Sequence, residues 1–154
     1  MTTEIQLAFL RKAYSAALIS GHIFPGVAAA EAALESAWGT SGLALKANNL
    51  FGLKKAQNWL GQTVSILTRE YLSGKWITVP AQWPVFASWQ ECIAARMATL
   101  NRVGVYADAL KATTPEEFIT RVSAHWATDP DRATKVLAIY HAHPDILAPM
   151  KEAA

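Results

Sequence analysis

Apolar residues recur every three or four positions at both ends of the chain, which is the spacing of one helix face. The first such run predicts a helix over residues 4–19, and Gly21 follows it as a stop signal. Its apolar positions are Ile5, Leu7, Ala8, Phe9, Tyr14, Ala17 and Leu18. Pro25 suits the first turn of a second helix, which we expect to continue to about Trp38.

Between about residues 60 and 86 the pattern changes from helical spacing to the composition of strands. The segment TVSILTREYLSGKWITVPAQWPVF is rich in Val, Ile, Thr and aromatic residues, and Ser73-Gly74 offers a turn. These residues predict a β-hairpin, or small β-lobe, inserted after the second helix. An insertion at that point can form one wall of a cleft that faces the helix.

Helix-start signals then bring the chain back to helical structure. Capping boxes are found at Ser88-x-x-Glu91 and at Thr114-Pro115-Glu116-Glu117, and Asp129-Pro130 precedes the last periodic run. We therefore expect an α+β fold that is mostly α and forms one domain over residues 1–154, with the β-lobe at about 60–86.

Composition and charge restrict the class of protein. The chain has 154 residues, enough for one sizeable core, and its 52% hydrophobic and 17% charged residues are typical of a globular protein. No apolar run reaches the ~18 residues of a membrane span, and Glu4, Arg11 and Lys12 distinguish the N-terminal run from a signal peptide. A net charge of +2 gives no reason to expect nucleic acid. Cys92 is the only cysteine, which excludes an internal disulfide.

Two glutamates on the second predicted helix are the main candidates for chemistry. Glu31 and Glu35 are four residues apart and share a helix face, in a segment that is otherwise mostly alanine. One interpretation is a solvated acidic stripe. In the other, Leu34 and Trp38 shield Glu35 from water beside the Glu31 charge, so that it keeps a proton near neutral pH, as a general acid must. The spacing leaves both interpretations open.

The remaining polar residues give weaker signals. The histidines (His22, His125, His141 and His143) lack the spacing of metal ligands, so we expect neither a metal ion nor a cofactor. We expect Asp129 to cap a helix or, as a second interpretation, to border the cleft. We expect Ser36 to orient the helix or the acid, and Cys92 to be buried. We expect solvated side chains at Arg102, Arg121 and Arg132. Of the six tryptophans, most should pack in the core, but a groove lined by them would stack against sugars.

The segment AAAEAALESAWGTSGLALKANNLFGLK, residues 28–54, resembles the signature of the peptidoglycan glucosaminidases of glycoside hydrolase family 73. This family includes bacterial autolysins and the wall-cutting domain of the flagellar rod-cap protein. TREYLSGK resembles the family's β-lobe segment with the second acidic residue, and FASWQECIAARMATLNRVGVYADAL and HWATDPDRATKVLAIY resemble the segments that follow. The resemblance runs in family order over about residues 5–142.

The resemblance implies a lysozyme-like fold, with a helical body, a β-lobe and a cleft between them. It implies hydrolysis of the β-1,4 bond between N-acetylglucosamine and N-acetylmuramic acid. On the matching positions, Glu35 is the general acid and Glu70 the second carboxylate, which we expect to act as the base. The resemblance also implies a set of substrate-binding residues: Asn49, Phe51, Gly52, Tyr71 and Trp126.

Two departures from the family pattern lie near the implied acid. Trp126 stands where the family has a tyrosine, and an indole can stack on a sugar and donate an N–H but offers no phenolic oxygen. Glu31 replaces a usual glutamine and adds a charge. The route also stays open: carboxyls ~6.5–9.5 Å apart favour inversion, ~5–5.5 Å favours retention, and the substrate's acetamido oxygen offers a third route. We expect the hairpin to hold Glu70 too far from Glu35 until a glycan closes the cleft.

Other functions remain open from the sequence. They are a muramidase or lytic transglycosylase acting on the same polymer, and a non-catalytic glycan-binding module, which the change to Trp126 would favour. The chain starts with Met and shows no export signal or wall-binding repeat. We therefore expect a phage endolysin, made in the host cytoplasm and released to the cell wall or periplasm. We expect it to be a monomer that binds peptidoglycan glycan strands and neither nucleic acid nor a membrane interior.

Overall fold

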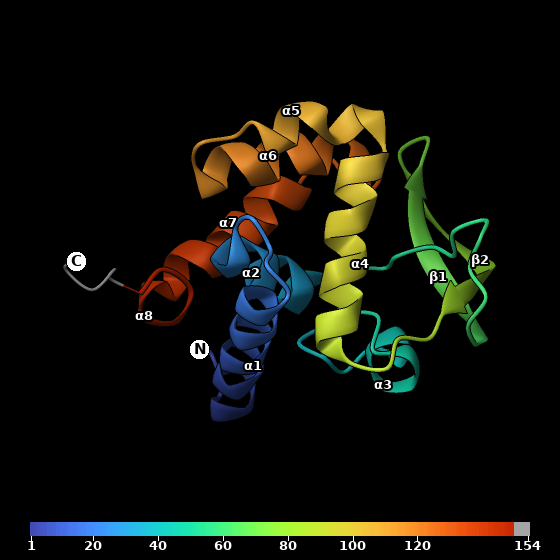
Figure 1. Cartoon of the computed structure of the whole chain (residues 1–154), viewed down its shortest axis with the longest axis horizontal. Coiled ribbons are helices and arrows are strands. Elements are labelled where there is room, and N and C mark those ends of the chain that lie inside the picture. Colours follow the sequence, from blue (N-terminus) through green and yellow to red (C-terminus); the bar gives the residue numbers. More distant parts are fainter. Residues whose placement is uncertain (150–154) are drawn as a thin grey trace.

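The computed structural model describes residues 1–149, which form a helical body with one β-hairpin at its edge (Figure 1). The helices are α1 (Glu4–Ile19), α2 (Pro25–Glu35), α3 (Gly42–Ala47), α4 (Trp89–Arg102), α5 (Ala107–Leu110), α6 (Pro115–Trp126), α7 (Arg132–Ala142) and α8 (Pro144–Leu147), with a 3-10 turn, η1 (Gly104–Tyr106), before α5. The strands are β1 (Thr63–Leu72) and β2 (Lys75–Pro84). The predicted fold class, mostly helical with a small β-lobe, is confirmed. Within the described part of the chain, no helix is both long and apolar enough to cross a membrane.

Small side chains let α2 pack closely at the centre of the body. Helix α2 lies against α1, α7 and α8, and its alanines from Ala28 to Ala33 are buried. Gly26 makes the closest approach, because a Cβ at this position would lie 1.9 Å from the carbonyl oxygen of Leu147 in α8. Helices on several sides therefore fix α2 and its C-terminal residue, Glu35.

The second helix ends earlier than its sequence pattern predicts. It stops at Glu35 instead of continuing to Trp38, because Ala37 and Trp38 adopt left-handed backbone angles, with φ of 49° and 58°. The Ser36 hydroxyl closes this turn by donating to the Ala32 carbonyl and accepting the Gly39 N–H. Such conformations are uncommon for residues with a Cβ and carry no sequence signal here. The chain then forms α3, which the pattern did not predict.

The predicted capping boxes are only half present. Ser88 and Thr114 accept the N–H groups of Glu91 and Glu117, as predicted. The reciprocal bonds differ, because Glu91 accepts from the Ala87 N–H, and Glu117 pairs with Arg121.

The last helices also begin differently from the prediction. Helix α7 starts at Arg132, and Asp131 occupies its N-cap position without a side-chain bond. Asp129 instead accepts the Asp131 N–H before the helix begins. The predicted Asp129 cap is therefore wrong for α7, and the short helix α8 was not predicted.

The hairpin has the predicted turn. Strands β1 and β2 are antiparallel with Leu72 opposite Lys75, and Ser73 and Gly74 between them have φ of 50° and 78°. Two residues with positive φ match the twist of the adjoining strands. Among the described helices, only α3 packs against the hairpin, which therefore stands away from most of the body (Figure 1).

Candidate active site

A cavity of about 990 Å³ lies between the hairpin and the helical body. The hairpin forms one wall through residues 68–73, Trp76 and Trp83. The other walls are the end of α2, the loop after α3, the segment 124–129 that ends α6, and the start of α7. The cleft with one β wall, which the sequence predicts, is therefore present.

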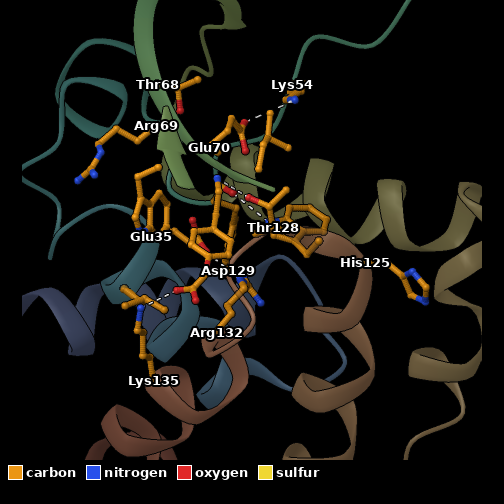
Figure 2. Close-up of a pocket in the computed structure, with 18 of the residues that line it drawn as sticks. Glu35, Lys54, Thr68, Arg69, Glu70, His125, Thr128, Asp129, Arg132 and Lys135 are labelled. Carbon is orange, nitrogen blue, oxygen red and sulfur yellow. Dashed lines mark hydrogen bonds and ion pairs between the residues drawn. The ribbon is translucent and has the colours of Figure 1, made fainter. Parts of the chain in front are cut away.

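Glu35 enters the cavity from the helical body. It is the last residue of α2, and its side chain is 23% exposed. Its Oε1 accepts a hydrogen bond of 2.8 Å from Arg132 Nε at the start of α7. Both residues line the cavity (Figure 2). The candidate acid thus has a fixed ionic partner on a second helix.

Glu31 is buried, and the interpretation as a solvated acidic stripe is wrong for it. Its carboxylate is 0% exposed and accepts bonds of 2.6 and 2.8 Å from Arg96 Nη2 and of 2.7 Å from Arg132 Nη2. Burial on its own raises the pKa of Glu31, but the charges and hydrogen bonds of the two arginines outweigh it and lower that pKa below the ordinary value. Glu31 is therefore an ionised partner of two arginines and adds no uncompensated charge beside Glu35.

The two arginines are the main residues that the sequence did not reveal. Arg132 was expected to be solvated, which is wrong, because its side chain is 1% exposed. Arg96 is also fully buried, and its Cζ lies 4.3 Å from the Trp126 ring centroid and 4.8 Å from that of Phe51. A guanidinium this close to two aromatic rings is favoured by their π-electrons. Arg96 therefore supports two residues that line the cavity.

Glu70 enters the same cavity from β1, so the structure brings both candidate carboxyls together. Its side chain is 24% exposed, and its Oε1 lies 3.7 Å from Lys54 Nζ (Figure 2). The Lys54 side chain is 72% exposed, and pairs of this kind contribute little to stability. Glu70 is thus held far less firmly than Glu31 or Glu35.

Of the five predicted substrate-binding residues, four line the cavity: Phe51, Gly52, Tyr71 and Trp126. Asn49 does not line it. Its buried amide bonds both the N–H and the carbonyl of Leu53, which closes the loop between them. The Trp126 N–H donates to the Phe51 carbonyl at 3.1 Å, so it is engaged within the protein, whereas the sequence suggested that it could reach a sugar. Their contacts with substrate stay predictions.

The cavity also contains polar residues outside the predicted substrate-binding set. Asp129 lines it, as the second interpretation of this residue predicted, and pairs with Lys135 at 2.6 Å. Thr128 links the body to the hairpin, because its hydroxyl accepts the Tyr71 N–H at 2.7 Å. His125 lies apart from the other labelled side chains in Figure 2. Thr128 and Asp129 lie directly after α6, in the loop that contacts the hairpin through Thr128, whereas His125 belongs to the last turn of α6.

Comparisons with known proteins identify the family. The glucosaminidase family model, described as mannosyl-glycoprotein endo-beta-N-acetylglucosaminidase, matches residues 11–144. The exo-glucosaminidase LytG of Bacillus subtilis (strain 168) is 37% identical over 125 residues, which are 77% of this chain and 43% of LytG. The peptidoglycan hydrolase FlgJ of Salmonella typhimurium is 35% identical over 116 residues, which are 71% of this chain and 36% of FlgJ. The chain thus spans less than half the length of these two relatives.

A solved structure agrees with this result. The catalytic domain of the autolysin Auto from Listeria monocytogenes superimposes with a TM-score of 0.78 and 26% identity, over 97% of this chain and 90% of that domain. The resemblance in residues 28–54, the fold with its cleft, and the family match over most of the sequence all agree. The chain belongs to the glucosaminidase family.

Proposed function

We propose that this chain is a glycoside hydrolase that cuts the β-1,4 bond between N-acetylglucosamine and N-acetylmuramic acid in peptidoglycan. The observation that carries the proposal is the pair of carboxyls that enter one cavity, Glu35 from the helical body and Glu70 from the hairpin. Glycoside hydrolysis generally uses two carboxyls that flank the scissile bond. The polymer and the bond are suggested by the names of the relatives, an exo-glucosaminidase and a peptidoglycan hydrolase.

Glu35 acts as the general acid in this proposal. Its Oε1 already accepts from Arg132, so the proton that it donates is carried by Oε2. The proton goes to the glycosidic oxygen as the bond between that oxygen and the anomeric carbon breaks. Negative charge then develops on Glu35 next to the Arg132 guanidinium, which stabilises the charge where it forms.

Glu70 acts as the base. It takes a proton from a water molecule whose oxygen bonds to the anomeric carbon, and the sugar leaves with a new reducing end. In the other route that remains open, the substrate's acetamido oxygen attacks first and Glu70 orients the acetamido group. Direct attack of water gives the α anomer, whereas attack by the acetamido oxygen, or by Glu70 itself as a nucleophile, gives the β anomer, so proton NMR of the fresh product distinguishes inversion from retention.

The lining of the cavity suits a sugar polymer. Tyr71 and Trp76 of the hairpin contact each other edge to face, with ring centroids 5.2 Å apart, and Trp76 is 47% exposed. Exposed aromatic faces at the entrance of a polar cleft can stack on the apolar faces of sugar rings. The cavity therefore offers stacking on its hairpin side and ionic groups on its helical side.

The proposal is tested by the ends of the fragments that the purified chain releases from peptidoglycan. After borohydride reduction and mass spectrometry, reduced N-acetylglucosamine ends are expected. Reduced muramic acid ends would indicate a muramidase, anhydro-muramic ends a lytic transglycosylase, and binding without fragments a glycan-binding module. A phage endolysin origin, release from the host cytoplasm and a monomeric state stay predictions from the sequence.

A further inference from the structure

The buried ionic cluster formed by Glu31, Arg96 and Arg132 supplies neither of the two proposed catalytic carboxyls, yet it touches the candidate acid. Every nitrogen of the Arg132 guanidinium has a partner. Nε donates to Glu35 Oε1 at 2.8 Å, Nη1 to Ser123 Oγ at 2.9 Å, and Nη2 to Glu31 Oε2 at 2.7 Å. A planar guanidinium bonded on all sides cannot rotate away from one partner without losing the others.

The partners of Arg132 come from two other helices. Glu31 and Glu35 lie one turn apart on α2, and Ser123 lies on α6. Two carboxylates at this spacing repel each other on an isolated helix. Arg132 lies between them and bonds to both, so it removes the repulsion and also determines where the Glu35 carboxyl can lie.

Glu31 is itself held by Arg96 from α4. Buried charges are tolerated when they are paired and hydrogen-bonded, and Glu31 satisfies this condition for both arginines. The chain of contacts therefore runs from α4 through Glu31 to Arg132 and on to Glu35. It ends at the most exposed member, because the Glu35 side chain is 23% exposed and the Arg132 side chain 1%.

We propose that Arg132, held in place by Glu31, is a positioning residue for the general acid Glu35. It fixes Oε1 as an acceptor, leaves Oε2 to carry the proton, and stabilises the carboxylate that remains after the proton has been donated. The inference rests on the proposed function, in which Glu35 is the acid. It adds a residue that acts through Glu35 and need not touch the glycan.

The charged groups around Glu35 come from several elements. They are Glu31 on α2, Arg96 on α4, Arg132 and Lys135 on α7, Asp129 in the loop between α6 and α7, and Glu70 on β1. Among these, Arg132 is hydrogen-bonded to Glu35. Replacing it should therefore change where the Glu35 carboxyl lies.

The kinetic test compares Arg132→Gln and Arg132→Lys with the control Arg121→Gln, which removes an equal charge from the α6 surface. With soluble glycan strands, Arg132→Gln should lower kcat by about 100-fold at unchanged KM, the effect of a misplaced catalytic group. Arg132→Lys should also leave kcat low at unchanged KM, because an ammonium cannot bond to three partners in a plane.

A second variant keeps the test valid if Arg132→Gln does not fold. Ser123→Ala removes only the Nη1 partner and keeps every charge. It should lower kcat by a smaller factor without a change in KM. A kcat equal to that of Arg121→Gln in both Arg132→Gln and Ser123→Ala would overturn the positioning role.

Carbon-13 NMR of the glutamate carboxyls detects the contact between Arg132 and Glu35 without relying on activity. The Glu35 signal is assigned by its loss in Glu35→Gln, and its chemical shift at pH 7 should change in Arg132→Gln but not in Arg121→Gln, because Arg132 donates a hydrogen bond to this carboxyl. An unchanged chemical shift in a folded Arg132→Gln would overturn the inference even if the wild type were active. If the wild type released no fragments, the proposed function would fail, and the NMR comparison would still decide whether Arg132 controls Glu35.

Discussion

At the scale of single residues, the site depends on charges that are buried as completely as the apolar core. Arg96 and Arg132 are 0% and 1% exposed, and either one alone would strongly destabilise the fold. The Glu31 carboxylate between them bonds to both, and Arg132 has a second carboxylate partner in Glu35. Arg96 still has two guanidinium nitrogens, Nε and Nη1, without a hydrogen-bond partner among the described residues. The rings of Phe51 and Trp126 lie against it instead.

His22 makes the fold sensitive to acid. Its Nδ1 accepts the Phe24 N–H at 3.0 Å, and its ring packs edge to face on Phe118. Burial, with the charge of Arg96, lowers the pKa of His22 from 6.5 to about 3, although Glu31 opposes this. The His22 side chain therefore binds a proton near pH 6.5 in the unfolded chain, but only near pH 3 in the folded chain. The contribution of His22 to the free energy of unfolding is therefore complete above pH 6.5. It is lost as the pH falls from about 6.5 towards 3, by up to ~1.4 kcal/mol per pH unit.

We predict that His22→Asn weakens this pH dependence, because Asn Oδ1 can still accept the Phe24 N–H but does not titrate. The measurement is the free energy of urea unfolding at pH 7 and pH 4.5. His125→Asn, which replaces an exposed histidine, is the control and should keep the wild-type difference. Some slope should remain in His22→Asn, because the lowered pKa of Glu31 has the same sign. A difference as large as that of the wild type would contradict the assignment to His22.

At the scale of elements, the hairpin carries Glu70 but has few attachments to the body. It packs on α3, and the Tyr71 N–H reaches Thr128 across the cavity. A two-stranded ribbon is only marginally stable alone, so such attachments decide where it lies. The expectation that the hairpin moves Glu70 relative to Glu35 when a glycan binds stays a prediction.

Thr128→Val should loosen the hairpin while leaving the body intact. The change keeps the shape of the side chain and removes the acceptor for the Tyr71 N–H, a bond worth ~0.5–1.5 kcal/mol. We expect kcat/KM to fall by up to ~10-fold and the amides of β1 to exchange faster with deuterium. Thr134→Val, on the exposed face of α7, is the matched control. Unchanged exchange in β1 would show that Thr128 does not hold the hairpin.

Glu70→Gln should lower the rate of peptidoglycan hydrolysis strongly, but by less than Glu35→Gln. The base can be replaced in part by the substrate's acetamido group or by a neighbouring residue, whereas the acid has no substitute. Initial rates of both variants on the same peptidoglycan measure this order. If Glu70→Gln were as active as the wild type, Glu70 would be only a solvated hairpin residue, and Glu35 would be the sole catalytic carboxyl.

At the scale of the whole molecule, local signals predicted the hairpin and the long helices, but not the short helices α3 and α8, the end of α2, or the contacts between residues distant in the sequence. The hairpin was predictable because Ser73-Gly74 and the strand residues beside it act within a short segment. The end of α2 was not, because Ala37 and Trp38 are forced into left-handed angles by the turn that Ser36 closes.

The candidate site likewise contains residues that the sequence identified and residues that only the folded structure reveals. The family motifs identified Glu35 and Glu70, but the partners of Glu31 lie 65 and 101 residues away from it in the sequence. Arg96 and Arg132 follow no motif of charge spacing, so their burial could be seen only after α2, α4 and α7 had been packed together. Asn49 was predicted to bind substrate because it belongs to a family motif, but its amide is used to close a loop.

The most direct test of the central claim measures new reducing N-acetylglucosamine ends released from purified peptidoglycan by the wild type and by Glu35→Gln. Gln keeps the size of the side chain and loses the proton, so the rate should fall by ~10²–10⁴-fold while circular dichroism shows an intact fold. Glu117→Gln, a surface change on α6, should retain the wild-type rate. Release of these ends by Glu35→Gln at the wild-type rate would contradict the account.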